Sequence, residues 1–164
     1  MADTAEITAF WRTYANAAGI ANDSYEALAM ANGEAPLADE LLELILSGRK
    51  RATAGLLRDH EVKGEALPVV GEHVVVLDSK GAPRAIWRTT ELRIGPFVSV
   101  DDAFAWDEGE GDRSRADWLE GHRWWFGRQA DREGFAFADD TPTIFERFEV
   151  VWPPEAADDS VRSP

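Results

Sequence analysis

The sequence predicts an α+β domain or a small barrel. Three observations support this prediction: two amphipathic helical segments come first, a pair of β-patterned segments follows, and a last helix precedes a closing strand. This order differs from the regular strand–helix alternation of a doubly wound parallel sheet. The chain has 164 residues, which corresponds to one domain of the usual ~150 residues.

The first part of the chain is predicted to be mainly helical. A helix is expected to begin after Asp3 or Thr4, either of which can cap it, and Gly19 suits its end. Apolar residues recur on one face at helical spacing, namely Ile7, Phe10, Trp11, Tyr14, Ala15 and Ala18. A second helix is expected after Pro36, with Leu37, Leu41, Leu44 and Ile45 on one side. Between the two helices, residues 25–32 are ambiguous between strand and coil.

From residue 68 onward the apolar period changes to that of β-structure. Residues 71–78 contain a β-branched run and residues 84–94 alternate, so the two segments are predicted to form a β-hairpin around the intervening turn. One face of the second strand is expected to carry Ile86, Thr90, Leu92 and Ile94. Gly95 and Pro96 are expected to end this strand, and a short helical segment over 100–106 follows.

The last helix is predicted to begin at Ser114, with Asp117 completing a partial capping box. Its apolar stripe is expected to comprise Trp118, Leu119, His122, Trp125 and Phe126. Residues 143–152 are predicted to form the closing strand. The remaining segment, 153–164, is rich in proline and acidic residues and is expected to be a frayed tail.

Composition restricts the function. The 17 basic and 31 acidic residues give a formal net charge of −14, which argues against a protein that coats duplex DNA through a broad basic surface. A small ligand remains compatible, because its binding depends on the local potential. The absence of cysteine excludes disulfides, thiolate metal sites and cysteine nucleophiles. No segment matches a membrane span or a secretory signal, so a cytoplasmic protein without membrane contact is expected.

The segment SGRKRATAG, residues 47–55, is the first that could carry chemistry. It places Arg49, Lys50 and Arg51 in a row after the second helix. The simplest interpretation is that these cations complement the negative end of that helix. The functional alternative is a lysine that acts as a base or anion ligand, with Thr53 supplying a hydroxyl.

The second such segment is WDEGEGDRS, residues 106–114, which crowds Asp107, Glu108, Glu110 and Asp112 into six positions. These carboxylates could bind a divalent cation, although the segment does not match the twelve-residue calcium loop. The alternative is a solvated acidic turn before a helix N-terminus. His122 is interpreted as a core or rim histidine bonded to the backbone rather than a catalytic one.

Together, the two segments resemble the ASCH domain family. The residues that carry the resemblance are Gly48, Lys50 and Thr53 in SGRKRAT, then EGEGDRS, followed by Trp118 and His122 in ADWLEGHRWWF. The opening FWRTYANAAG and the closing FERFEVVW resemble the longer bacterial branch of that family.

The resemblance covers roughly residues 5–152 and implies a PUA-like fold, a small mixed β-barrel flanked by helices. Residues 1–152 are therefore expected to form a single ASCH domain with an N-terminal helical extension. Residues 153–164 are expected to be a flexible acidic tail.

The family is linked to RNA metabolism. One short branch hydrolyses the acetyl amide of N4-acetylcytidine with a Lys, a Thr and a Glu, which correspond here to Lys50, Thr53 and, by position, Glu108. Five further residues are expected to bind substrate: Gly48, Arg51, Trp106, Asp112 and Ser114. A relative closer in length is a metal-dependent ribonuclease on single-stranded RNA, and a non-catalytic RNA- or nucleotide-binding module is the third hypothesis.

For amide hydrolysis, Thr53 would be the nucleophile, Lys50 the base, and Glu108 would orient Lys50 or pass a proton to the leaving nitrogen. For ribonuclease action, Lys50 with Arg51 would stabilise the phosphorane, and Glu108 or Asp112 would act as base or metal ligand. The expected ligand is a nucleoside or single-stranded RNA, bound by a monomer or homodimer. No resident metal or cofactor is expected, with Mg²⁺ or Mn²⁺ required only by a ribonuclease.

Overall fold

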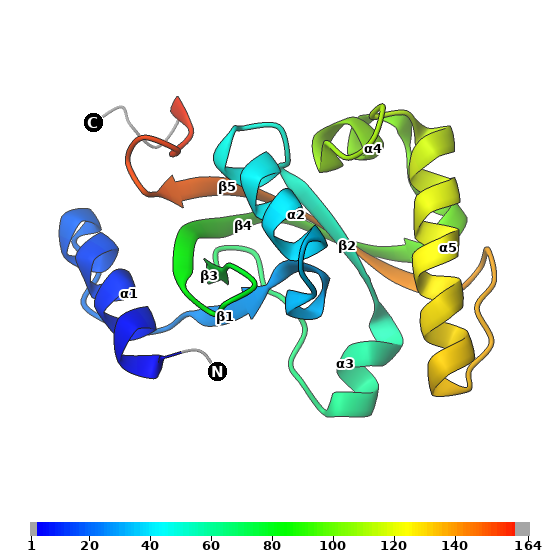
Figure 1. The fold of residues 1–164 in the computed structure, drawn as a ribbon, viewed down its shortest axis with the longest axis horizontal. Coiled ribbons are helices and arrows are strands. Elements are labelled where there is room, and N and C mark those ends of the chain that lie inside the picture. The colour runs from blue at the N-terminus through cyan, green and yellow to red at the C-terminus, as the bar shows by residue number, and fades with distance from the viewer. Residues whose placement is uncertain (1–2, 160–164) are drawn as a thin grey trace.

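A five-stranded mixed sheet forms the centre of the molecule (Figure 1). The computed structural model describes residues 3–159. The strand order is β1-β3-β4-β5-β2, with β1 parallel to β3 and the other neighbours antiparallel. The strands are β1 (Glu26–Ala29), β2 (Ala52–Leu56), β3 (His73–Leu77), β4 (Pro83–Pro96) and β5 (Pro142–Trp152). The curved sheet is a half-barrel, which confirms the predicted α+β class.

Five α-helices surround the sheet, with α1 and α5 at opposite ends of it (Figure 1). They are α1 (Thr4–Ala18), α2 (Leu37–Leu46), α3 (Leu57–Lys63), α4 (Asp102–Glu108) and α5 (Arg115–Glu133). Short 3₁₀ turns occupy Met30–Gly33 and Phe97–Ser99. Among residues 3–159, no helix combines the length and apolar character needed to cross a membrane.

Helix α1 forms where the sequence predicts it. The Asp3 side chain accepts a hydrogen bond from the backbone N–H of Ala5, and Gly19 ends the helix at φ 71°, a backbone conformation that glycine adopts without steric cost. The buried face includes Trp11, which is fully buried against strands β3, β4 and β5. The N-terminal helix is therefore part of the core.

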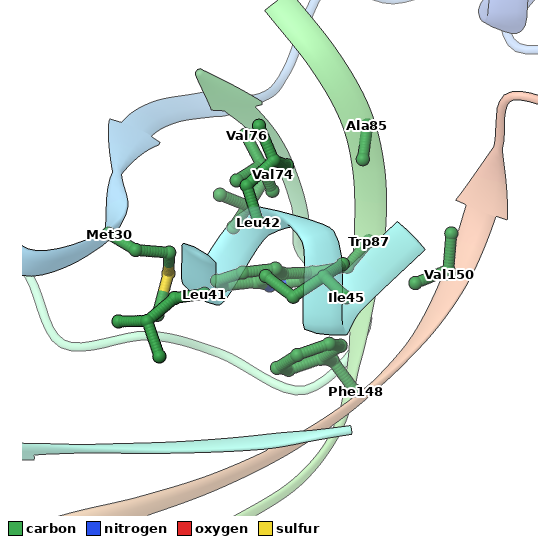
Figure 2. Close-up of a cluster of buried hydrophobic side chains, with 10 residues drawn as sticks. All are labelled: Met30, Leu41, Leu42, Ile45, Val74, Val76, Ala85, Trp87, Phe148 and Val150. Atoms are coloured by element: carbon green, nitrogen blue, oxygen red, sulfur yellow. The ribbon is translucent and has the colours of Figure 1, made fainter. Parts of the chain in front are cut away.

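Helix α2 covers the middle of the sheet and packs on a second apolar cluster (Figure 2). The indole of Trp87 on β4 stacks on the ring of Phe148 on β5, with ring centroids 4.2 Å apart. The buried members are Met30, Leu41, Leu42, Ile45, Val74, Val76, Ala85, Trp87, Phe148 and Val150. The helix predicted after Pro36 is thus confirmed, and its apolar side faces the sheet.

The β3–β4 hairpin is confirmed, but the prediction for the face of β4 is wrong. Thr90 and Ile94 are exposed, whereas Thr89 is buried. The pairing of β4 with β5 is irregular between Ile86 and Trp87 and again between Thr89 and Glu91. At each irregularity, the side chains no longer alternate regularly between the two faces of the sheet. Counting every second residue along the sequence therefore assigns side chains to the wrong face.

Helix α5 begins at Ser114, whose hydroxyl accepts a hydrogen bond from the backbone N–H of Asp117. Trp118, Leu119 and Phe126 are buried as predicted, whereas Trp125 is only partly buried. Strand β2 and helix α3 were not expected from the sequence.

The prediction of a frayed tail is wrong for the part of the tail that the structure describes. Ala157 is buried, and Asp158 pairs with Arg51 at 2.8 Å. Asp158 also accepts a hydrogen bond from the backbone N–H of Val150. An acidic tail is fixed here because a cation distant in sequence lies beside it; residues 160–164 lie outside the described part.

The core role of α1 is tested by Trp11→Ala. Removing this buried indole should lower the free energy of unfolding by about 3–5 kcal/mol, because it leaves a cavity between helix and sheet. Urea denaturation measures the change. Trp106→Ala, which removes an indole that is 56% exposed, serves as the control and should cost less than about 1 kcal/mol. Equal effects of the two substitutions would contradict the packing of α1 described above.

Candidate functional site

The two segments singled out in the sequence lie against each other. The Arg49 side chain donates to the carbonyl oxygens of Gly109, at 2.6 Å, and Gly111, at 2.8 Å. The backbone N–H of Arg51 donates to the carbonyl of Asp107 at 2.6 Å. Gly109 ends α4 at φ 75°, and a Cβ at this position would come within 2.3 Å of the Arg49 carbonyl oxygen. Only glycine permits this approach.

Lys50 lies in the turn between α2 and β2 and points inward. Its residue surface is 1% exposed. Its Nζ lies 3.1 Å from Glu110 Oε2 and 3.6 Å from Glu108 Oε1. A buried ammonium requires partners of opposite charge, and the acidic turn after α4 supplies them. The two candidate segments therefore bring the Lys50 ammonium and the Glu108 carboxylate together.

Glu108, the last residue of α4, is buried at 2% exposure. Its Oε1 lies 2.9 Å from His122 Nε2, and its Oε2 accepts a hydrogen bond from the indole N–H of Trp118. Burial opposes ionisation, but the charges of Lys50 and His122 outweigh it and hold the pKa of Glu108 well below its usual range. Glu108 is therefore a carboxylate whose two oxygens are both engaged.

His122 on α5 has both ring nitrogens opposite acceptors. Nδ1 lies 2.8 Å from the carbonyl oxygen of Trp118, and Nε2 faces the carboxylate of Glu108. A carbonyl and a carboxylate only accept, so both nitrogens must carry protons. Burial lowers the pKa of His122, but Glu108 outweighs this effect and raises it overall. The imidazolium stacks on the Trp118 ring at 3.8 Å, where a cation is attracted by the ring face.

Glu110 is the group of this cluster that titrates near neutrality. Its side chain is 31% exposed. Burial raises the pKa of Glu110 to about 7 against the opposing charge of Lys50, and the negative charge of Glu108 adds to the rise. Sequence reasoning assigned Glu110 no catalytic role and interpreted His122 as a structural residue. Two features of the sequence could have indicated these roles. They are the second carboxylate of EGEG, which is Glu110, and the position of His122 four residues after Trp118.

A cavity of about 260 Å³ opens over this cluster. Lys50, Thr53, Glu108, Glu110 and His122 form its polar side. The Thr53 hydroxyl, on β2, has no hydrogen-bond partner among residues 3–159. The apolar side includes Met30, Leu37, Leu41, Trp124, Trp125 and Phe126. Thus the three residues predicted to be catalytic line one cavity.

The five residues expected to bind substrate do not line it. Arg51 is turned toward Asp158 and the Ile45 carbonyl. Gly48 forms the turn after α2 at φ 89°. Trp106 is 56% exposed and lies under the Arg113 guanidinium.

Asp112 and Ser114 hold the start of α5 instead of facing the cavity. The backbone N–H of Ser114 donates to Asp112 Oδ1 at 2.7 Å, and the Ser114 hydroxyl caps the helix. Asp112 and Ser114 follow Glu108 by four and six positions in the sequence, but the turn directs them outward.

Glu108, Glu110 and His122 also form a possible metal-binding group, with ligand atoms within 4.8 Å of one another. The donor set does not fit a resident divalent ion as it stands. The Lys50 ammonium already lies between the two carboxylates, and His122 would have to lose the Nε2 proton that faces Glu108.

Comparison with known proteins identifies relatives of the chain. A family model described as the ASCH domain matches residues 27–152. The crystal structure of an ASCH domain from Lactobacillus crispatus JV V101 has a TM-score of 0.81 and 31% identity, covering 91% of this chain and 96% of that chain. A crystal structure of a protein from Enterococcus faecalis V583 has a TM-score of 0.83 and 28% identity, covering 91% and 90%. No curated protein matches the chain.

The titration of Glu110 predicts how stability depends on pH. A carboxyl whose pKa is raised from 4.5 to about 7 contributes stability that is present below pH 4.5 and lost as the pH rises through 7. The free energy of unfolding should therefore decline between pH 5 and 8. The pKa of His122 is also raised. Its titration therefore adds to the decline once the pH exceeds about 6.5, the ordinary pKa of histidine.

Urea denaturation at pH 5, 6, 7 and 8 measures this slope. Glu110→Gln should make it shallower, because the amide does not titrate. Glu120→Gln, which changes an exposed glutamate on α5, should retain the wild-type slope. An unchanged slope in Glu110→Gln would show that Glu110 keeps an ordinary pKa.

Proposed function

The chain belongs to the ASCH domain family, and on this premise we propose that it is a hydrolase of RNA metabolism that removes the acetyl group of N4-acetylcytidine. The observation that carries the proposal is the cavity lined by Lys50, Glu110 and Thr53, whose hydroxyl has no hydrogen-bond partner among residues 3–159. A nucleophile, an anion-stabilising cation and a group that titrates near neutrality are the parts that amide hydrolysis requires.

The size and lining of the cavity support a small aromatic substrate. Its volume of about 260 Å³ is below the ~300–1,000 Å³ of typical ligand pockets. Trp124, Trp125 and Phe126 line one side of it, and aromatic side chains stack on any nucleobase. The formal net charge of −14 disfavours a polyanion, so a single nucleoside suits the site better than an RNA strand.

We assign the proton transfers to Glu110. As a carboxylate it takes the proton of the Thr53 hydroxyl, whose oxygen attacks the acetyl carbon. Glu110 then gives this proton to N4, and cytidine leaves while the acetyl group stays on Thr53 as an ester. A water molecule, deprotonated by Glu110, hydrolyses the ester to acetic acid, and Glu110 returns the proton to the Thr53 oxygen. Acetic acid ionises to acetate on release. A pKa of about 7 suits a group that both accepts and donates a proton.

Lys50 and Glu108 have supporting roles in this mechanism. A lysine must be deprotonated to act as a base, whereas the Lys50 ammonium is paired with two carboxylates. The ammonium suits stabilisation of the tetrahedral oxyanion instead. Glu108 has both oxygens engaged and a lowered pKa, so it positions Lys50 and does not carry protons. This assignment revises the expected roles of Lys50 as base and Glu108 as proton shuttle.

The ribonuclease remains a second candidate because three potential metal ligands lie within 4.8 Å of one another. Metal binding would require the Lys50 ammonium to leave its position between Glu108 and Glu110. It would also remove a proton from His122. The paired cluster therefore supports the amidohydrolase better than the metal-dependent reaction.

Release of cytidine from N4-acetylcytidine tests the proposed function. Thr53→Ala should lower kcat/KM by at least about 100-fold, because it removes the nucleophile. Glu110→Gln should lower it by about 10²–10⁴-fold, and Lys50→Met by about 10²–10³-fold. The wild-type kcat/KM should fall as the pH decreases below about 7, where Glu110 becomes protonated.

Glu120→Gln provides the control and should retain full activity, since this glutamate is exposed on α5. Circular dichroism melting of each variant separates lost chemistry from lost folding. Absence of cytidine release by the wild type would refute the proposal. Degradation of single-stranded RNA with Mn²⁺ but not with EDTA would then support the ribonuclease, and RNA binding without turnover would support a non-catalytic module.

A further inference from the structure

A second cavity, of about 410 Å³, adjoins the first. It lies away from Lys50 and extends toward α3 and β4. Six residues line both cavities: Met30, Ala31, Thr53, Ala54, Trp125 and Phe126. The proposed nucleophile therefore stands at the boundary between the two spaces, and a ligand that reaches Thr53 from the first cavity can extend into the second.

The wall of this second cavity contains Glu146, a buried carboxyl next to Thr53. The two residues are directly paired between β2 and β5, so their side chains share one face of the sheet. Glu146 is 7% exposed, and its Oε1 accepts a hydrogen bond from the Thr89 hydroxyl at 2.6 Å. A carboxyl group has capacity for several hydrogen bonds, so the bond from Thr89 leaves some of that capacity for other donors.

Trp87 supplies a second polar group to the same cavity. The residue is 1% exposed, and its ring lies flat against Phe148 (Figure 2). Its Nε1 makes no hydrogen bond within the described residues, although it lies near enough to Glu146 to favour the charge on that carboxyl. Buried donors without an acceptor are rare because they are costly. An unpaired donor on a cavity wall indicates a ligand that brings an acceptor.

The charges around the second cavity disfavour a phosphate. Its lining holds three acidic side chains, Asp59, Glu133 and Glu146, and two basic ones, Arg58 and Lys63. Arg58 is already paired with Asp59 at 2.9 Å and with Glu133 at 2.6 Å. The acceptor that the cavity favours is therefore neutral. Burial also raises the pKa of Glu146, which is consistent with a neutral partner.

We infer that this second cavity is the sugar subsite, in which a ribose hydroxyl accepts a hydrogen bond from Trp87 Nε1 and bonds to Glu146. A hydroxyl can accept and donate at once, which matches an indole N–H beside a carboxyl. The inference rests on the proposed function. In cytidine, N4 lies across the ring from N1, which carries the sugar. A base whose acyl group meets Lys50 and Thr53 therefore directs its sugar away from Lys50.

This assignment makes the substrate a free nucleoside. A nucleobase alone would leave the Trp87 N–H without an acceptor and make no bond to Glu146. A 5′-phosphate would bring negative charge toward a wall that holds more acidic than basic side chains. The site should therefore prefer cytidine over both cytosine and cytidine 5′-monophosphate.

Isothermal titration calorimetry with cytidine, cytosine and cytidine 5′-monophosphate tests the inference without depending on turnover. The wild type should bind cytidine at least tenfold more tightly than either other compound. Trp87→Phe keeps the stacked ring but removes the N–H, so it should weaken cytidine binding about tenfold and leave cytosine binding unchanged. Glu146→Met, which keeps the side-chain volume but removes the carboxyl, should act in the same direction and provides a second variant if Trp87→Phe unfolds.

Trp152→Phe is the matched control, because Trp152 packs against α1 and lines neither cavity. It should bind cytidine as the wild type does. Equal affinities of the wild type for cytidine and cytosine would overturn the inference, as would tight binding of cytidine 5′-monophosphate or no binding of cytidine. An equal loss of affinity for cytidine and cytosine in Trp87→Phe would also overturn it. A failure of the proposed function appears separately, as cytidine binding without acetyl release from N4-acetylcytidine.

Discussion

The buried charge of Glu108 is the constraint on which the site depends. An isolated carboxylate in the interior would be strongly destabilising, so its position is tolerated only where cations and donors surround it. The structure provides Lys50 from the turn after α2, and His122 and Trp118 from α5. Without Glu108, the indole N–H of Trp118 and Nε2 of His122 would lose their acceptor, and Lys50 would lose one of its two carboxylate partners. The cluster therefore holds together, at one end of the sheet, three segments that are distant in sequence. Within it, the protonation state of Glu110 and the occupancy of the cavity can still change.

The run of three cations shows how neighbouring residues acquire different roles. Arg49 binds carbonyl oxygens of the acidic turn, Lys50 enters the interior, and Arg51 binds Asp158 near the C-terminus. Arg49 and Arg51 thus fix the backbone on both sides of Lys50. The two arginines are structural supports for the lysine, which alone of the three reaches the cavity.

Much of the fold follows from local signals in the sequence. Caps and helical spacing identify α1, α2 and α5, and a β-branched run before a turn identifies the β3–β4 hairpin. Which side chains of β4 face the core could not be predicted, because the irregularities of this strand depend on its pairing with β5. Asp158 could not be placed either, since its partner is Arg51, 107 residues earlier. For the site, the resemblance singled out Lys50, Thr53 and Glu108, which line one cavity, but which side of the acidic turn faces inward is set by α5. The roles of Glu110 and His122 therefore emerged only from the structure.

The protonation state of His122 tests this account most directly. Nitrogen-15 NMR of the imidazole at pH 7 should show protons on both ring nitrogens, although an ordinary histidine with a pKa near 6.5 is mostly neutral at that pH. In Glu108→Gln, the same signals should change to those of a neutral ring, because the carboxylate that favours the charge is gone. A neutral His122 in the wild type at pH 7 would contradict the account, since Glu108 would then lack one of the two cations that stabilise its charge.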